Sequence, residues 1–294
     1  MACVRSAWLV LSDGRSILLE DESSGYFCTS LDLGYPDVRE VTNARPDADG
    51  TIDTTLLYGA RVVTAAVSAF LGAGASIDDV YGRFAPFVAL GARPDLHYVL
   101  DRPNAPERVL RGLRAAAYAG PIAGPFQRDL QMQWVAADPF PRGVALNVAT
   151  AWRGSGVAGR GYNLTFNRTY PAGSSGPVAA SIPNRGDVAL KPYLRIYGPV
   201  SNPVVQINYS PYFGVVGMLY NIDAGHFVGI DTDKHTAFLD DLPNQSVLSA
   251  LDWVNLRWPV IPPDPRAATL SFTAGDGATS STQVQATWQD GFLT

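Results

Sequence analysis

The chain has 294 residues, and 47% of them are hydrophobic, which is enough to bury a substantial core and excludes a disordered or fibrous protein. Its 28 glycines and 22 prolines favour turns over helices, so the composition predicts many short strands. The net charge is -5 and no run of basic residues is present, which argues against a nucleic-acid-binding protein.

The chain opens with a predicted β-hairpin, because the apolar runs 8–11 and 17–19 flank an Asp-Gly pair. Strands are predicted next over 38–41 and 61–70. The stretch 43–53 between them contains Pro, Gly and several Asp residues, which favour turns, so it is predicted to be a loop.

One helix is predicted in the first half of the chain. Ser76 followed by Asp79 matches a capping box, and apolar residues then recur at helical spacing, which predicts a helix over about 76–90. Three stretches with β character follow, each bounded by Pro or Gly: 97–101, 108–118 and 130–136. In the last of them apolar residues alternate with Gln131 and Gln133, so this strand is predicted to have one buried face and one uncharged polar face.

A domain boundary is predicted where two prolines follow Asp138 closely, because proline interrupts both strand ladders and helices. The predicted division is a first domain over 1–138, a linker over 139–160 and a second domain over 161–294. A short helical turn is predicted near 246–252, and the remaining pattern suits a two-sheet sandwich or jelly roll. The strand candidates of this half are 162–166, 193–197, 204–209, 215–220, 226–230, 256–258, 268–272 and 284–288.

Catalytic and metal-binding patterns are weak, and no catalytic residue, metal ligand or cofactor is predicted. Asp231, Asp233 and His235 alternate, so on one strand they would share a face and could form a metal or acid/base cluster. The same stretch is typical of a tight turn between two strands, which is the preferred interpretation. A jelly-roll glycosidase needs a pair of carboxylates, and after Glu107 the chain offers only aspartates. The chain is therefore predicted not to be an enzyme, with a hydrolase acting through Asp231 or Asp233 as an alternative.

Aromatic residues are dense in the second half, and Tyr193, Tyr209 and Tyr212 are candidate glycan contacts, because sugar-binding faces stack aromatic rings. Core packing accounts for most of these rings, so a carbohydrate-binding adhesin is the alternative function. Cys3 and Cys28 form no CxxC pair, which excludes a disulfide framework. No apolar run approaches the roughly 20 residues that span a bilayer and no signal peptide is evident, so no membrane partner is expected and synthesis is expected in a cytoplasm.

Several strings spread over nearly the whole chain carry a family resemblance. They are Arg93-Pro94 with Leu96-His97-Tyr98; Gly120-Pro121-Ile122 and Gly124-Pro125-Phe126 leading into Gln131-Met132-Gln133-Trp134; Leu164-Thr165-Phe166-Asn167-Arg168 with Tyr170-Pro171; Arg195-Ile196-Tyr197-Gly198-Pro199 with Asn202-Pro203; Asn244-Gln245-Ser246 with Leu251-Asp252-Trp253; and Ala286-Thr287-Trp288-Gln289-Asp290-Gly291. Together they resemble distal tail proteins, a class of minor tail protein, of long-tailed (siphovirus-type) phages that infect actinobacteria. A composition typical of a GC-rich genome fits such a host.

The resemblance implies a mainly β protein: an N-terminal tail-tube-like β-sandwich or barrel with one packed helix, and a C-terminal galectin-like β-sandwich. Such proteins form a six-membered ring at the distal end of the tail tube, adapt the tube to the tail-tip hub and fibres, and form part of the DNA conduit. The implied partners are further copies of the chain, the tail tube protein, the tail-tip hub protein, the tape measure protein and tail fibres. The implied location is the virion.

A ring around DNA constrains the first domain. Residues 1–138 hold 12 of the 22 basic and 17 of the 27 acidic side chains, so this domain is acidic. A lumen should be polar and neutral or negative, because cationic contacts to phosphates would slow the DNA. The candidate lumen or ring-interface residues are Asp47, Asp49, Asp53, Gln131 and Gln133. The loop 43–53 with residues 54–58 is expected to form an arm between subunits, because a cyclic ring needs heterologous interfaces.

Overall fold

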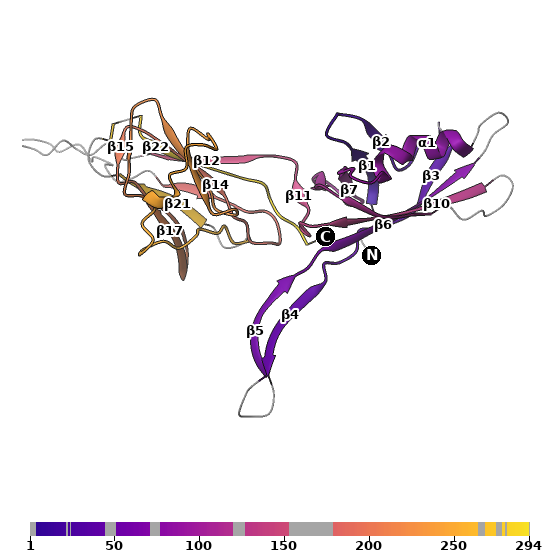
Figure 1. Cartoon of the computed structure of the whole chain (residues 1–294), viewed down its shortest axis with the longest axis horizontal. Coiled ribbons are helices and arrows are strands. Elements are labelled where there is room, and N and C mark those ends of the chain that lie inside the picture. The colour runs from indigo at the N-terminus through magenta and orange to yellow at the C-terminus, as the bar shows by residue number, and fades with distance from the viewer. Residues whose placement is uncertain are drawn as a thin grey trace, which may run out of the picture. The chain divides into compact units, whose positions relative to one another are not determined.

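The computed structural model describes residues 4–21, 23, 25–44, 51–70, 77–119, 127–152, 179–263, 268–274, 278–279 and 281–293. The chain divides into two compact units: Met1–Val144 with Phe292–Thr294 form the first, and Ala145–Gly291 form the second. The second unit is therefore inserted near the end of the first, and the chain crosses between them twice. Each unit is built mainly from two antiparallel sheets (Figure 1), which confirms the predicted mainly β fold.

The first unit contains a five-stranded sheet, a four-stranded sheet and the helix α1 (Ile77–Val88). The five-stranded sheet has the order β11-β8-β7-β1-β2, with β1 (Val4–Val10), β2 (Ser16–Leu18), β7 (Asp95–Leu100), β8 (Arg108–Leu110) and β11 (Arg142–Gly143). The four-stranded sheet has the order β3-β6-β10-β9, with β3 (Tyr26–Asp32), β6 (Arg61–Phe70), β9 (Arg114–Ala119) and β10 (Gln127–Ala136). The β1–β2 hairpin and α1 confirm the predicted hairpin and helix, although the expected capping residue Ser76 lies outside the described residues.

The core of the first unit is formed by its two sheets and α1. Alternation along β10 directs Leu130, Met132 and Trp134 inward, where all three are fully buried. The helix adds Phe84 and Phe87 to the same core, and the Trp134 Nε1–H donates to the Phe87 carbonyl oxygen at 3.2 Å. Because this bond satisfies the indole N–H, the helix is held on the sheet by a directed interaction as well as by apolar contact.

Among the described residues, strands β4 (Val38–Ala44) and β5 (Thr51–Tyr58) pair only with each other, as a separate two-stranded sheet. Figure 1 shows this hairpin leaving the sheets of the first unit and extending away from them. The prediction of a loop over 43–53 is wrong at both ends, because Ala44 pairs with Thr51. Pairing across the hairpin extends both strands through residues whose local composition favours turns.

The stretch 108–118, predicted as one strand, forms two strands that belong to different sheets. Strand β8 ends at Leu110 and β9 begins at Arg114. Gly112 between them has a φ of +62°, which favours glycine, and its N–H donates to Asp95 Oδ1 at 2.7 Å. The chain thus leaves one sheet and enters the other at a single glycine, which summed strand propensity does not detect.

The second unit is a sandwich of a five-stranded and a four-stranded sheet. The first has the order β12-β22-β14-β19-β20, with β12 (Asn147–Trp152), β14 (Tyr193–Tyr197), β19 (Phe227–Asp231), β20 (Thr236–Leu239) and β22 (Gln283–Trp288). The second has the order β13-β21-β16-β17, with β13 (Ala180–Ile182), β16 (Val204–Tyr209), β17 (Tyr212–Gly217) and β21 (Ala268–Thr273). A two-stranded sheet joins β15 (Val200–Ser201) to β18 (Asn221–Ile222), and the predicted turn near 246–252 contains the 3-10 helix η2 (Leu248–Ala250).

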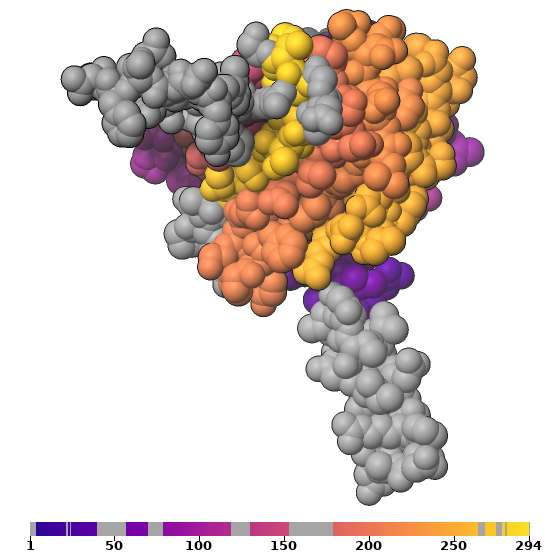
Figure 2. Space-filling model, turned by 90° about the vertical axis from the view of Figure 1, so that its left-hand side faces the viewer, coloured from indigo at the N-terminus to yellow at the C-terminus, as the bar shows by residue number. Residues whose placement is uncertain are grey.

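The core of the second unit draws on both sheets of the sandwich. Ile196 from β14 and Val284 from β22 are fully buried in one apolar cluster with Ile207 from β16 and Leu270 from β21. The orange and yellow segments of the space-filling view pack against one another into a continuous surface (Figure 2). The strand alternation expected of a two-sheet sandwich is therefore realised in both sheets.

Four expectations for this half differ from the structure or lie outside the described residues. The stretch 139–160, expected to be a linker, contains β11 and β12, because partner strands complete ladders that the local sequence does not indicate. The predicted strand 215–220 begins earlier, at Tyr212, and 256–258 is not a strand but meets Val215 through an isolated bridge. The candidate 162–166 lies outside the described residues.

The last residues of the chain return to the first unit and are held by two buried arginines. The Arg61 guanidinium, which has no exposed surface, donates through Nη2 to the Leu293 carbonyl oxygen. The Arg108 guanidinium lies 3.8 Å from the centre of the Phe292 ring, and the Phe292 N–H donates to the Pro141 carbonyl oxygen at 2.9 Å. The C-terminal residues are thus part of the core that they complete.

Replacing Phe292 with alanine should lower the free energy of unfolding by roughly 3–5 kcal/mol, the usual cost of removing a buried phenylalanine. The ring is only 5% exposed, and its loss also removes the contact with the Arg108 guanidinium. Urea unfolding of the full chain measures the change. The control is Leu90→Ala in the same unit, because Leu90 is fully exposed and should change stability by no more than about 0.5 kcal/mol. Equal stability of the Phe292 variant and wild type would show that the C-terminal return is not structural.

Candidate functional site

The outward face of the sheet β3-β6-β10-β9 carries the predicted glutamines. Gln131 is exposed and Gln133 is half-buried on β10, and they lie opposite Ala66 and Thr64 of β6. In the same rows of the sheet, β3 contributes the acceptor-bearing Ser30 and Asp32 and β9 contributes small alanines. Most of this face is therefore uncharged or acidic, which suits a surface that anions pass without binding.

One cation lies at the end of this face. Arg114 pairs with Val135 at the start of β9, and its side chain is exposed. The β9–β10 ladder shifts register between Gln133 and Trp134, so Arg114 lies beyond the shift from the two glutamines. The polar face thus has a neutral centre and one basic end.

One of the three acidic candidates lies within the described residues. Asp53 lies in β5 opposite Thr42, while Asp47 and Asp49 lie outside the described residues. At the base of the hairpin, the Gly59 N–H donates to the Asp37 carbonyl oxygen at 2.6 Å. The Tyr58 ring meets Phe140 edge to face at 5.3 Å between centres. The hairpin is therefore anchored at its base and makes no sheet with another strand of the described chain.

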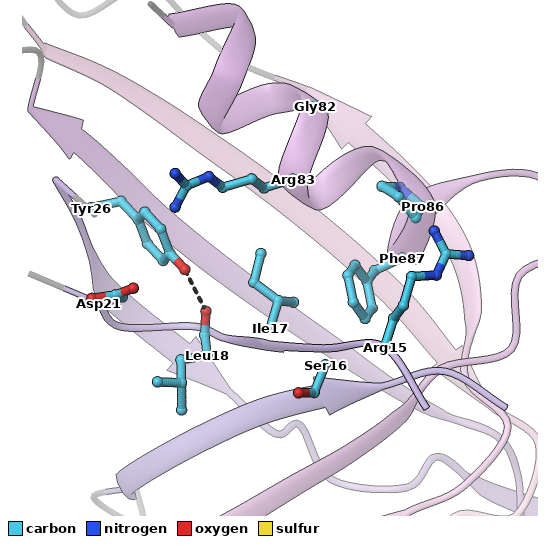
Figure 3. A pocket seen from close by; sticks show the side chains of 10 residues that line it. All are labelled: Arg15, Ser16, Ile17, Leu18, Asp21, Tyr26, Gly82, Arg83, Pro86 and Phe87. Atoms are coloured by element: carbon cyan, nitrogen blue, oxygen red, sulfur yellow. Dashed lines mark hydrogen bonds between the residues drawn. The ribbon is translucent and has the colours of Figure 1, made fainter. Parts of the chain in front are cut away.

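A hollow of about 630 Å³ lies between the β1–β2 hairpin and α1. Figure 3 shows Arg83 extending from the helix toward Tyr26, and Arg15 extending toward Pro86 on the opposite side. The Tyr26 hydroxyl donates to the Leu18 carbonyl oxygen at 3.3 Å, an outward-facing backbone group of the edge strand β2 (Figure 3). The lining has mixed charge, because Asp21 also borders the hollow and Arg15 already pairs with Asp13 at 2.7 Å. The sequence offered no signal for this hollow, because its residues come from separate elements.

The three tyrosine candidates do not form one surface. Tyr209 and Tyr212 face each other across the β16–β17 hairpin, with ring centres 6.1 Å apart, and Tyr212 is 61% exposed. Tyr193 lies in β14, which belongs to the other sheet. The structure therefore brings together two of the three residues that the sequence grouped.

The Tyr193 hydroxyl is already engaged by a polar cluster. It donates to Asp241 Oδ1, while the Arg195 Nη2 donates to Asp241 Oδ2 at 2.7 Å. Burial and the Asp241 carboxylate raise the pKa of Tyr193. A Cβ at residue 229 would lie 1.9 Å from Asp241 Oδ1, so Gly229 leaves the space that the cluster occupies. The cluster binds β14 to the turn after β20 and leaves the Tyr193 hydroxyl bonded within the protein.

The Asp231–His235 stretch is the turn between β19 and β20, as the preferred interpretation predicted. Asp231 Oδ1 accepts the N–H groups of Asp233 and Lys234 at 3.0 Å each, and His235 has a φ of +56°. The His235 ring stacks on Trp258 at 4.3 Å between centres. Over the described part of the chain, no group of three His, Cys, Asp or Glu residues could hold a metal ion.

Cys28 is a free thiol on β3, and burial raises its pKa to about 11. At neutral pH this thiol stays protonated and is a poor nucleophile. Cys3 lies outside the described residues. No helix in the described ranges is long and apolar enough to cross a membrane.

Comparisons with known proteins find likeness in structure. No family model and no curated protein matches the sequence. The crystal structure of the Dit protein of phage SPP1, described as a paradigm of the hub adsorption apparatus in phages infecting Gram-positive bacteria, matches with a TM-score of 0.64 and 12% identity, over 98% of this chain and 99% of that one. The baseplate of phage P2 in its activated conformation with Ca matches with a TM-score of 0.46 and 11% identity, over 97% of this chain and 98% of that one. The first likeness shows that the two chains share a fold.

The pKa of His226 should lie above its ordinary value of 6.5, because the Asp240 carboxylate accepts a hydrogen bond from its Nδ1 at 2.6 Å. The pKa of Asp240 is lowered by the Phe227 N–H and by His226. The stability from His226 is therefore complete below about pH 6.5 and is lost as the pH rises through the raised value. NMR titration of the imidazole measures it, and Asp240→Asn should return the pKa toward 6.5. An unchanged pKa in that variant would contradict the pairing.

Proposed function

We propose that this chain is a structural protein of the distal tip of a phage tail, and that it acts through assembly without catalysis. The observation that carries the proposal is a fold shared with a phage hub protein over nearly all of both chains. A likeness confined to one sandwich would give little support for a function, since such sandwiches serve many functions. Here the likeness covers both units, because it extends over 98% of this chain.

The finer proposal is a ring of six copies that adapts the tail tube to the tail-tip hub, as the sequence resemblance implies. A closed ring needs two different surfaces on each copy, one for each neighbour. The hairpin of β4 and β5 supports this proposal, because its strands pair with no other described strand and it extends from the sheets of the first unit (Figure 1). It is the element of this unit best suited to reach a second copy.

The ring would give DNA a passage, and the outward face of β3-β6-β10-β9 is the proposed lining. Its support is the uncharged pair Gln131 and Gln133, with the acidic Asp32 in the same row as Gln133. The partners proposed with the ring are the tail tube protein, the tail-tip hub protein, the tape measure protein and tail fibres. The proposed location is the virion of a long-tailed phage, with an actinobacterial host as the source that the composition fits.

A second candidate function is binding of host cell-wall glycans by the second unit. Its support is the Tyr209–Tyr212 pair at the end of the β16–β17 hairpin, with the Tyr212 ring largely exposed. An exposed aromatic ring can pack on the apolar face of a sugar. An array of cell-wall glycans incubated with the full chain tests it, and the absence of any bound glycan would leave only the scaffold role.

Trimming the hairpin should abolish the ring without unfolding the chain. Replacing 43–53 by an Asn-Gly turn keeps the pairs Val38–Tyr58 and Arg39–Leu57 at the base. Light scattering should give about six copies for wild type and one for the trimmed chain, because the ring would lose one of its two surfaces. Thermal unfolding of both proteins is the control for folding. A ring that persists after trimming would refute the role of the hairpin.

Adding charge to the proposed lining should slow DNA passage. Gln131→Arg with Gln133→Arg places cations on the neutral face, and each phosphate contact would retard the DNA in a salt-dependent way. Phage particles that carry the variant should release their genome more slowly than wild-type particles, and this difference should be larger at low than at high ionic strength. The matched control is Leu90→Arg, a fully exposed position of the same unit outside this sheet. Equal release from the two variants would place the lining elsewhere.

A further inference from the structure

A second hollow, of about 390 Å³, lies on the outward face of the sheet β13-β21-β16-β17. Its floor includes Gln206 and Val215, and Phe213 lies at one side. The segment that follows η2 contributes Asp252, Asn255 and Arg257. The volume falls within the roughly 300–1,000 Å³ typical of small-molecule sites.

The segment 252–257 is fixed to β17 by its backbone. Arg257 exchanges two hydrogen bonds with Val215, at 2.7 and 2.9 Å, and the Asp252 N–H donates to the Gly217 carbonyl oxygen at 2.9 Å. The following Pro259 passes so close to β17 that a Cβ at Gly214 would lie 2.3 Å from the Pro259 Cα. This wall of the hollow therefore has one position relative to the sheet.

The polar side chains of the wall are also held in place. Asp252 accepts the Val254 N–H at 3.2 Å through Oδ1 and the Asn255 Nδ2 at 2.7 Å through Oδ2. This leaves the Asn255 Oδ1 as an acceptor. The Arg257 guanidinium lies 4.8 Å from the centre of the Phe213 ring, which restricts where its donors point. Preorganised groups of this kind lose little entropy when a ligand binds.

The floor continues into an uncharged polar face. Gln206 lies opposite Ser271, and Asn208 lies opposite Thr269. The Asn208 Nδ2 donates to Ser271 Oγ at 3.3 Å. Amide and hydroxyl groups, which both donate and accept, thus extend from the hollow across β16 and β21.

We propose that this hollow binds a neutral pyranose sugar. The lining balances one carboxylate, Asp252, against one guanidinium, Arg257, so it does not select an anion. Its amide, carboxylate and guanidinium groups match neighbouring sugar hydroxyls, which also donate and accept, and Phe213 with Val215 offers apolar surface for the C–H face of the ring. The site is distinct from the Tyr209–Tyr212 pair. Contact with host cell-wall glycan through it rests on the tail-tip role proposed above.

Saturation-transfer NMR with the full chain tests this site, because the method detects weakly bound ligands whether the protein is a monomer or a ring. The probes are glucose, galactose and N-acetylglucosamine, with glucuronic acid and inorganic phosphate as anionic comparisons. At least one neutral sugar should bind with a millimolar dissociation constant, as expected for a single shallow site. Asn255→Ala and Arg257→Ala should each weaken binding about tenfold or more, the effect of losing one or two hydrogen bonds.

The control is Tyr212→Ala, on the same sheet but outside the hollow, which should leave the affinity unchanged. Circular dichroism and thermal unfolding check that all variants fold. The proposal is overturned if no neutral sugar binds, if only the anionic probes bind, if both hollow variants keep full affinity, or if Tyr212→Ala alone abolishes binding. Light scattering of the same samples separates this result from the tail-tip role. A ring that binds no sugar would contradict only the proposed sugar site. A monomer that binds sugar would support the site and contradict only the ring.

Discussion

The ladder between β6 and β10 is the constraint on which the first unit depends. The two strands pair without a register shift from Phe70 opposite Gln127 to Arg61 opposite Ala136. Because side chains alternate along a strand, this single register decides which face of the sheet every residue of both strands occupies. It directs Trp134 toward α1 and Gln131 to the opposite face. The packing of the helix and the polarity of the proposed lining therefore have one cause.

The same alternation places a buried guanidinium beside the returning end of the chain. Val63, Ala65 and Val67 of β6 face inward, and Arg61 has the same parity, so it is buried with them. A buried guanidinium is costly unless it is bonded, and the chain end supplies the Leu293 carbonyl oxygen. Across the other sheet, Arg108 lies opposite Tyr98, and burial raises the pKa of Tyr98 to about 12. The returning end of the chain thus meets two buried arginines, Arg61 and Arg108, in the first unit.

In the second unit, close approaches that require glycine position the polar groups. Gly229 leaves the space for the Asp241 carboxylate between Tyr193 and Arg195, and Gly214 lets the segment after η2 lie against β17. At Gly229, the polar groups bind β14 to the turn after β20. The approach at Gly214 places Asp252, Asn255 and Arg257 at a hollow open to ligand. Similar residue types therefore serve as structure on one sheet and as a candidate binding surface on the other.

The sequence by itself determined the elements whose signal is local. The Asp-Gly hairpin, the helix after residue 76, the alternation of Gln131 and Gln133, and the Asp231–His235 turn all follow from neighbouring residues, and the structure contains each of them. Only the tertiary structure decided which distant segments meet: the pairing of β4 with β5, the split of 108–118 between two sheets, the separation of Tyr193 from Tyr209, and both hollows. The physical reason is that strand pairing and pocket formation join residues far apart in the chain, whose compatibility no local pattern records.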